Sequence, residues 1–499
     1  MASCSQPFRR WDTKQSFILP LNTADWLPEG HLALFIDKVV DEFDLAAFYE
    51  RYDGDGRGCV PYDPRMMVRI YLYGYAIGVT SSRKLEKRMI EDIAFRYLAA
   101  GNTPDHHTIS EFRRTNLKAL MGLFYQILEM LKKAGLVDLD QVAIDGTKVK
   151  ANAAMDRTWT LDKLNKEEQK LLDDIKRYFD ELEKNDAAED ALYGEENGFL
   201  LPKGMRTKKE IAERFRQLKK EMEEERLRQL DDLQKQDGEG AEVRKKKEEE
   251  EAAKGKKLRG RKPKEPDEKQ MRLKPVRVNL TDTESRLMST RSGYIQGWNV
   301  QLAVTLHSQM IAAVAVTDHG NDRQMLNFML DRLEASGVPP DLTTADNGYA
   351  SRKEIEQACA RTDLYIAMCD DPRDLPPGWG EGEMPLCLSI MGQMSWKMAT
   401  PEGKDIYSMR CSSVEPVNGQ LKEQQGMRQF RLRGQFKVEV EAHLHAAANN
   451  LKKMCQWPAQ AIDKCFEKRE KVEENGGNRG GSSPFHRKLE PLRGISGVF

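Results

Sequence analysis

Three acidic residues that lie far apart in the sequence have the types and settings that divalent metal ions require. Asp145 and Asp346 each follow a short apolar run of the kind that forms a β-strand. Glu415 stands seven positions before Lys422 in a segment that we expect to be helical, so both side chains share one face. Carboxylate oxygens are preferred ligands of hard cations, and two cations can stabilise both the attacking and the leaving oxygen of a phosphodiester. Together the three residues predict a site for two Mg²⁺ or Mn²⁺ ions.

Each of these residues, taken alone, has a simpler structural explanation. The Asp-Asn-Gly sequence that begins at Asp346 is typical of a turn, and Glu415 with Lys422 is typical of a solvated helix face. Only the ordered set of two aspartates and a glutamate favours a functional site. Pro416 suits the first turn of a helix, which predicts that Glu415 lies at a helix start.

The composition indicates a large soluble protein with long solvated stretches. The chain has 499 residues, enough for roughly two to four domains. Charged residues make up 32 % of the chain, yet the net charge is −1, so the total charge neither indicates nor excludes nucleic-acid binding. The 8 cysteines form no CxxC pair, which favours a reducing compartment without disulfides or a zinc site. Because no signal peptide or membrane-spanning run is recognisable, we expect a cytoplasmic protein with no membrane partner.

Residues 30–136, which follow an N-terminal arm over residues 1–29, are predicted to form short helices joined by tight turns. A later helix would carry Arg113 and Arg114 on its exposed face. Short helices with basic residues on the later one suit a helix-turn-helix-like DNA-binding domain. A plain helical bundle also needs solvated charges, so the pattern alone leaves both interpretations open.

Residues 137–155 and 275–456 are predicted to form an α/β part with a mixed sheet and helices on its faces. We expect Asp145 and Asp346 at the C-terminal ends of their strands, where ligands gather in open sheets. Asp322 is interpreted as the cap of the helix that follows it, and a position close to the acidic residues is the alternative that stays open. The expected strands are 137–151, 294–306, 310–317, 341–345 and 364–368; the expected helices are 323–335, 352–360, 414–424 and 436–456, with irregular structure over 386–407.

A charged segment interrupts this α/β part. Residues 156–236 are predicted to form a helical hairpin, because apolar residues recur at coiled-coil spacing in its second half. That stripe consists of Ile211, Phe215, Leu218 and Met222.

Residues 237–274 keep no apolar period and are predicted to be a disordered linker, like the tail over residues 457–499. Within the linker, Arg259 and Arg261 flank a glycine in a sequence like the core of an AT-hook. Such arginines can enter an A·T-rich minor groove. The alternative, a solvated basic linker, stays open.

The motifs resemble those of the DDE transposases of bacterial insertion sequences, whose catalytic core has an RNase H-like fold. The resemblance rests on Ala143–Lys148, on Thr344–Tyr349, on the set Tyr407, Arg410, Glu415 and Lys422, and on the N-terminal helical region rich in Tyr, Arg and Gly. A further stretch, Thr281–Met288 with Gly297–Gln301, resembles the core of one subgroup. Four residues separate Arg410 from Glu415, where the usual family pattern has three.

The resemblance implies a DNA transposase of the bacterial cytoplasm, associated with the nucleoid. Asp145, Asp346 and Glu415 would be the catalytic metal ligands, and Lys422, Arg410 and Lys148 would contact double-stranded DNA of the element ends and the target. One metal would activate water to nick DNA at the element's end, and the freed 3′-hydroxyl would then attack the target. Because two ends must be brought together, self-association on DNA is expected.

Two other functions stay open at this point. A structure-specific endonuclease with the same core would cut DNA without joining it. A DNA-binding relic of a transposase would bind without cutting, although the intact Asp, Asp, Glu set argues against it.

Overall fold

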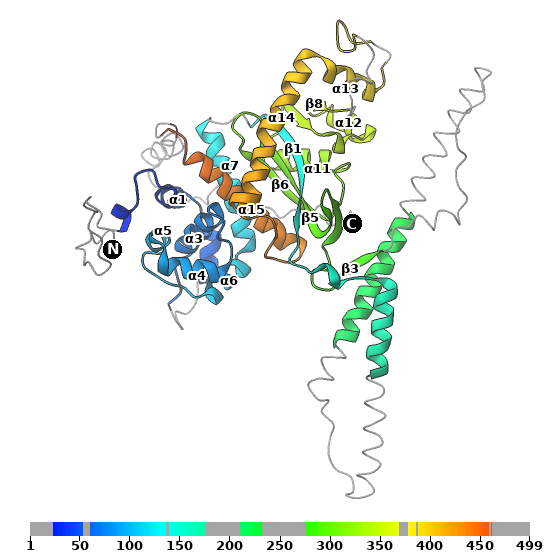
Figure 1. The fold of residues 1–499 in the computed structure, drawn as a ribbon. Helices are drawn as coiled ribbons and strands as arrows, with labels where there is room; N and C mark the ends of the chain where they lie inside the picture. The colour runs from blue at the N-terminus through cyan, green and yellow to red at the C-terminus, as the bar shows by residue number, and fades with distance from the viewer. Residues whose placement is uncertain are drawn as a thin grey trace, which may run out of the picture.

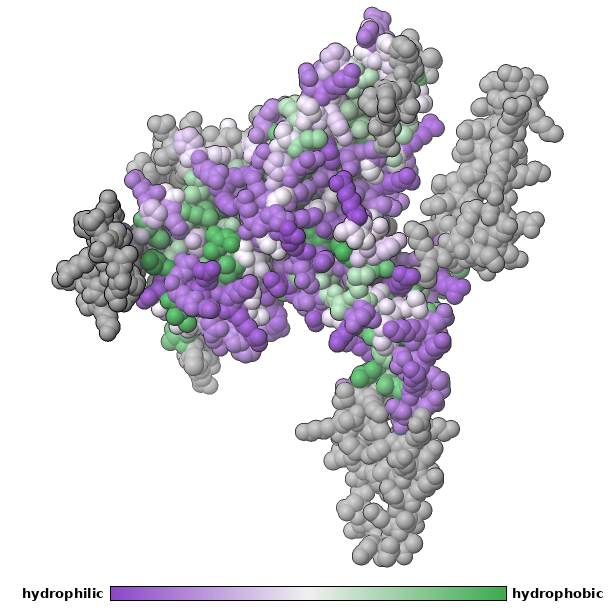
Figure 2. Space-filling view, viewed as in Figure 1, coloured by the Kyte–Doolittle hydropathy of each residue, from purple (hydrophilic) through white to green (hydrophobic). Residues whose placement is uncertain are grey.

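The computed structural model describes residues 23–52, 60–135, 139–174, 210–231, 276–368, 378–385, 388–458 and 461 (Figure 1). The charged linker with Arg259 and Arg261, most of the tail and the middle of the predicted hairpin lie outside the described residues, so the predictions for them stay predictions. The surface that Figure 2 shows is mostly hydrophilic, with small hydrophobic patches over the N-terminal helices. Among the described helices, none combines the length and the apolar character needed to cross a bilayer.

A mixed sheet of six strands lies at the centre of the α/β part, which confirms the predicted class. The strand order is β6-β5-β1-β7-β8, and β4 also pairs with β5. Strand β5 is antiparallel to β1, β4 and β6, whereas β7 is parallel to both β1 and β8. The strands are β1 Gln141–Lys150, β4 Arg286–Thr290, β5 Gly293–Thr305, β6 Ile311–Thr317, β7 Leu342–Ala345 and β8 Asp363–Ile366.

Alternating side chains of β1 enter two hydrophobic clusters, one on each face of the sheet. Ala143 and Val149 lie in the larger cluster, which α14 and α15 help to form. Val142 and Ile144 lie in the other cluster, with α11, α12 and α13. By the same alternation, Asp145 faces the α14 side. The helices are α11 Met325–Ala335, α12 Arg352–Ala358, α13 Ile390–Ala399, α14 Pro401–Gly419 and α15 Gln435–Met454.

The N-terminal region is helical, as predicted, but it shares the larger hydrophobic cluster with the sheet. Helix α15 packs against both α3 and α7, as Figure 1 shows. The predicted role of the N-terminal region as a separate DNA-binding domain stays a prediction. The α-helices are α1 Leu32–Asp41, α2 Ala46–Tyr49, α3 Pro64–Ala76, α4 Ser82–Glu91, α5 Ile93–Leu98, α6 His106–Thr115 and α7 Leu117–Ala134, with short 3₁₀ turns at Thr23–Trp26 and Glu50–Tyr52.

The strand expected over 137–151 is observed as β1, but Asp145 lies inside this strand and not at its C-terminal end, where it was predicted, because β5 pairs with β1 as far as Lys150. A second prediction is wrong. The segment 386–407, predicted to be irregular, contains α13 and the start of α14. Ser389 and Thr400 begin these helices, and each side chain accepts a hydrogen bond from the first turn.

The charged insertion begins and ends at a small second sheet, β2 (Thr158–Thr160) with β3 (Arg277–Asn279). A 3₁₀ turn, Met155–Arg157, precedes β2. Helices over 161–174 and 210–231 lie side by side and project from the core (Figure 1). Their contact is apolar and contains Leu164, Leu218 and Met222. Ile211, predicted to belong to the same stripe, is 37 % exposed.

Helix α15 carries two histidines whose burial makes stability depend on pH. His443 and His445 are buried, and desolvation lowers their pKa values to about 4 and about 3. The unfolded chain therefore binds more protons below about pH 6.5, and the contribution of each neutral histidine to stability is lost as the pH falls.

We therefore expect His445→Gln to remove part of this pH dependence. Between pH 7 and pH 5, the free energy of unfolding of the wild type should fall by about 2 kcal/mol relative to the variant. Urea unfolding of both proteins at the two pH values measures this difference. The exposed His307→Gln variant is the control and should run parallel to the wild type. If the wild type and His445→Gln lose equal unfolding free energy between pH 7 and pH 5, the fold does not hold this histidine neutral.

Candidate functional site

Parallel pairing of β1 with β7 brings two of the three predicted acidic residues together. The last pair in this ladder joins Ile144 to Ala345, so Asp145 and Asp346 follow at adjacent positions. The Nη2 atom of Arg410 lies 3.0 Å from Asp145 Oδ1 and 3.8 Å from Asp346 Oδ2. One guanidinium thus reaches both carboxylates, and we call Asp145 and Asp346 the acidic pair.

Helix α14 covers the acidic pair with two polar side chains. Val414 and Val417 are buried in the larger cluster, and this orients Arg410 and Asn418 toward β1. Asn418 Nδ2 donates to Asp145 Oδ2 at 2.9 Å, so each oxygen of this carboxylate has a donor from α14. The Arg410 side chain is only 9 % exposed. Arg410, expected at a DNA phosphate, therefore faces the carboxylates in this structure.

The environment of Asp145 opposes its negative charge. Burial raises the pKa of Asp145 to about 6; the Arg410 guanidinium acts in the opposite direction, and the carboxylates of Asp346 and Asp322 raise the pKa further. Burial also lowers the pKa of Lys422, against the attraction of Asp145. Three carboxylates thus lie near β1 and one guanidinium lies close to them. The resulting negative potential favours the approach of cations.

Glu415 lies on the same helix but does not join the acidic pair. Its side chain is exposed, and among the described residues it forms no hydrogen bond or ion pair with either aspartate. The prediction that it begins a helix is wrong, since α14 begins at Pro401 and Pro416 lies inside it. Proline cannot donate to the carbonyl four residues earlier, Ser412 O, and Gln309 Nε2 donates to that oxygen at 2.8 Å instead.

Beyond Gly419 the helix widens into a π-helical turn, Gln420–Gln424, which carries Lys422. Such turns interrupt the regular hydrogen bonds of an α-helix and are frequent at functional sites. Lys422 is half-buried and lies close enough to Asp145 for their charges to interact. Its predicted contact with DNA stays a prediction.

A third carboxylate, Asp322, supports the acidic pair from the other face of the sheet. Its Oδ1 accepts hydrogen bonds from Asn299 Nδ2 at 2.7 Å and Gln301 Nε2 at 2.6 Å, both on β5. Gln301 in turn accepts the hydroxyl of Tyr349, which lies in the 3₁₀ turn directly after Asp346. This network ties β5 to the turn that positions the second aspartate.

The sequence interpretation of Asp322 as a helix cap is wrong. Helix α11 begins at Met325, and no side chain caps it. The signal that could have revealed the network is the pair Asn299 and Gln301, two polar residues on one face of the mostly apolar stretch of β5 from Trp298 to Val304. Buried amides need hydrogen-bond partners, so their alternation predicts a polar group opposite them.

The structure also locates the other predicted DNA contacts. Arg113 was expected on an exposed face, but it is 8 % exposed and lies among tyrosines of α3, because α6 turns this side toward the core. Arg114 is exposed and pairs with Glu111 one turn earlier at 2.5 Å. Lys148 donates from Nζ to Ser289 O on β4 at 2.6 Å. The exposed location therefore holds for Arg114 and not for Arg113.

Within the described part of the chain, no three His, Cys, Asp or Glu side chains are grouped closely enough to hold a metal ion.

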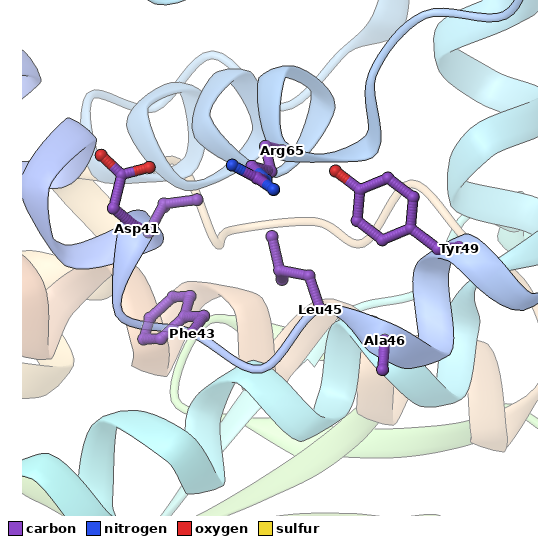
Figure 3. Close-up of a pocket in the computed structure, with 7 residues that line it drawn as sticks. Asp41, Phe43, Leu45, Ala46, Tyr49 and Arg65 are labelled. Carbon is purple, nitrogen blue, oxygen red and sulfur yellow. The ribbon is translucent and has the colours of Figure 1, made fainter. Parts of the chain in front are cut away.

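A separate cavity lies among the N-terminal helices, lined by residues that include Asp41, Tyr49 and Arg65 (Figure 3). Its charges are of both signs, and none of its lining residues belongs to the acidic pair. We therefore place the candidate site at the acidic pair and α14.

Two transposase families match separate parts of the chain. The transposase domain family (DUF772) matches residues 21–115, and the transposase DDE domain family matches residues 389–455. No curated protein and no solved structure matches the chain. The second match includes Arg410, Glu415 and Lys422, whereas the acidic pair lies outside both matches.

These matches define a transposase with a helical N-terminal region and a mixed α/β part. More specifically, the two matches together support an insertion-sequence DDE transposase, as the motifs predicted.

Gly146 is the point at which the Asp322 network touches β1, and it has no space for a side chain. A Cβ there would lie 2.4 Å from Asp322 Oδ1 and 2.6 Å from Gln301 Nε2. We expect Gly146→Ala to displace the network and lower the transposition frequency in cells about 100-fold, since small displacements of reacting groups have effects of that size. Gly122→Ala, on α7 with open space around it, is the matched control and should remain active. Full activity of Gly146→Ala would show that the Asp322 network is not needed to position Asp145.

Proposed function

We propose that this transposase cleaves the ends of its element and joins the freed 3′-hydroxyl to target DNA, with divalent metal ions as cofactors. The observation that carries the proposal is the acidic pair, two carboxylates set side by side where β1 extends past β7. The order β6-β5-β1-β7-β8, with three antiparallel strands followed by two parallel ones, supports an RNase H-like core. This order places Asp145 on the central strand.

The acidic pair fits a divalent cation. A single nitrogen of Arg410 already approaches both carboxylates, so a cation at that place would contact oxygens of Asp145 and Asp346. Asn418 Oδ1 is a further oxygen nearby, and it is buried without a hydrogen-bond partner among the described residues. Glu415 would complete the ligand set only after its side chain or α14 moves. Bound metal would supply Lewis-acid stabilisation of the phosphodiester oxygens.

Arg410 would act as a counter-ion of the acidic pair that a metal ion displaces. In the absence of metal, it balances the charge of two neighbouring carboxylates that would otherwise repel each other. Since a guanidinium and a metal ion compete for the same oxygens, loading of the site would release Arg410. Its planar fork then suits a DNA phosphate, as does the ammonium group of Lys422.

DNA transposition needs both ends of an element in one complex. We therefore propose that the chain works on double-stranded DNA as at least a dimer, with the N-terminal helices as part of the DNA-binding surface. The match of these helices to a transposase domain family supports this assignment. Arg114 is the exposed cation on α6 that fits such a role.

The central test replaces each carboxylate by its amide. We expect Asp145→Asn and Asp346→Asn to lower excision of a marked element at least about 100-fold, because each removes a metal ligand and hardly changes volume. Asp405→Asn, an exposed position on α14, is the control and should behave as wild type. Glu415→Gln is measured alongside them, and retained excision would remove Glu415 from the ligand set.

Mg²⁺-dependent nicking and joining of end DNA in vitro separates the remaining possibilities. Cutting without joining would indicate an endonuclease instead, and DNA binding without either would indicate an inactive relic. Each variant's DNA affinity, measured in EDTA, shows whether lost excision comes from the chemistry or from lost binding.

The counter-ion role of Arg410 gives a separate prediction. Arg410→Gln should bind Mg²⁺ about tenfold more tightly than wild type in the absence of DNA, because a positive charge next to both carboxylates is removed. Calorimetric titration with Mg²⁺ measures this change, and Arg352→Gln, an exposed arginine, is the control. Weaker binding by Arg410→Gln would mean that Arg410 holds the acidic pair in shape.

A further inference from the structure

The segment after α14 returns to the same edge of β1 that carries the acidic pair. We call residues 425–434 the edge loop. Within it, Phe430 N–H donates to Lys150 O at 2.9 Å, and Lys150 N–H donates to Arg428 O at 3.2 Å. Strand β5 occupies the other edge of β1 at Lys150, so the edge loop lies on the β7 side. Since β7 pairs only with residues 141–144 of β1, Asp145 lies between β7 and the edge loop.

Buried acidic side chains hold the main chain of the edge loop. Both carboxylate oxygens of Glu441, which is 1 % exposed on α15, accept the N–H of Arg431 at 3.0 Å, and one also accepts the N–H of Leu432 at 2.9 Å. Asp282, also buried, accepts the N–H of Gly434 at 3.1 Å. Three main-chain N–H groups of the loop thus donate to carboxyl oxygens that are themselves buried, so the loop is held in one shape.

Hydrophobic anchors fix the orientation of the side chains in the edge loop. Met427 and Phe430 are each 1 % exposed and belong to the larger hydrophobic cluster. The arginines between and after them, Arg428, Arg431 and Arg433, are exposed. A rigid loop with its apolar side chains inward therefore carries three guanidinium groups outward.

These arginines differ in how many hydrogen bonds and ion pairs their guanidinium groups form within the protein. Among the described residues, Arg431 forms no ion pair, and its carbonyl accepts Asn152 Nδ2 at 2.6 Å. Arg433 Nε donates to the Asn152 carbonyl at 3.0 Å, which leaves its other nitrogens for a partner. Arg428 pairs with Glu423. Arg431 is thus the group most ready to bind an external anion.

We propose that the edge loop is a contact surface for the DNA backbone, an inference that rests on the proposed function. Lys150 lies five residues beyond Asp145, about 17 Å along an extended strand. Each nucleotide advances a DNA strand by about 3.4 Å along the axis. With the DNA axis aligned along β1, the edge loop would contact phosphates about five nucleotides from the one that the acidic pair acts on. Guanidinium groups on a fixed frame suit this regular array of phosphates.

The first test measures the salt dependence of DNA binding. A labelled 30-bp duplex of arbitrary sequence is titrated with protein in EDTA at several NaCl concentrations, and binding is followed by fluorescence anisotropy. Each phosphate contact contributes about 0.9 to the slope of log Kobs against log salt. We expect Arg431→Ala to lower the slope by about one, Arg431→Ala with Arg433→Ala to lower it by about two, and Arg431→Lys to keep it. The control is Lys133→Ala, an exposed cation paired within α7, which should keep the wild-type slope.

Unchanged slopes in both alanine variants would overturn the proposal. The assay needs neither metal nor cleavage, so its outcome is independent of the proposed chemistry. If the wild-type protein cleaves DNA and the slopes of the variants are unchanged, only the edge loop's contact with DNA is rejected. If the slopes fall and the wild-type protein does not cleave, only the proposed function is rejected.

The second test addresses position. Once the cleaved bond is mapped, single phosphates of the end DNA are replaced by uncharged methylphosphonates. Neutralising the phosphate about five nucleotides from the cut should weaken binding by wild type and leave binding by Arg431→Ala unchanged. An equal loss for both proteins at that position would contradict the assignment.

Discussion

The parallel pairing of β1 with β7 is the contact on which the candidate site depends. Asp145 and Asp346 come from distant parts of the chain, with the charged insertion between them, and only this ladder places them at adjacent positions. Its register is strict because side chains alternate between faces. A slip of one residue would turn Asp145 away from α14 and toward the face where Asp322 lies. The long antiparallel pairing of β1 with β5 prevents such a slip, since both faces of β1 are packed.

Carboxylates lie on both faces of the sheet at β1. Asp145 faces α14, and Asp322 lies behind it, where two amides of β5 hold its carboxylate. Only Arg410 reaches Asp145 as a full positive charge among the ion pairs of the described residues. A buried carboxylate with a raised pKa and incomplete compensation is unfavourable for stability and favourable for cation binding, which is a balance typical of functional sites. This imbalance gives the acidic pair a chemical role that a plain turn aspartate would lack.

Much of this arrangement could be predicted from the sequence, and the failures have local physical reasons. Strands β5, β6 and β7 and helices α11, α12 and α15 follow their hydrophobic periods, and the acidic pair follows from two apolar runs that end in aspartate. Pro416 suggested a helix start, but Gln309 satisfies the carbonyl that the proline leaves free, so α14 runs through it. Arg113 looks solvated in a helical pattern because no pattern within α6 shows that α3 and α15 cover it. Burial of a charged residue depends on partners distant in sequence.

Helix α14, its π-helical turn and the edge loop form one continuous segment, and this continuity links DNA contact to the state of the acidic pair. Arg410 near the middle of α14 touches both carboxylates, Lys422 follows in the π-helical turn, and Arg431 lies in the loop that Glu441 holds. A DNA backbone bound at the loop would bring phosphates toward Lys422 and Arg410. Phosphates that attract Arg410 and cations that repel it from the carboxylates favour the same movement. DNA and metal would therefore each strengthen the binding of the other, as linkage between two ligands of one state requires.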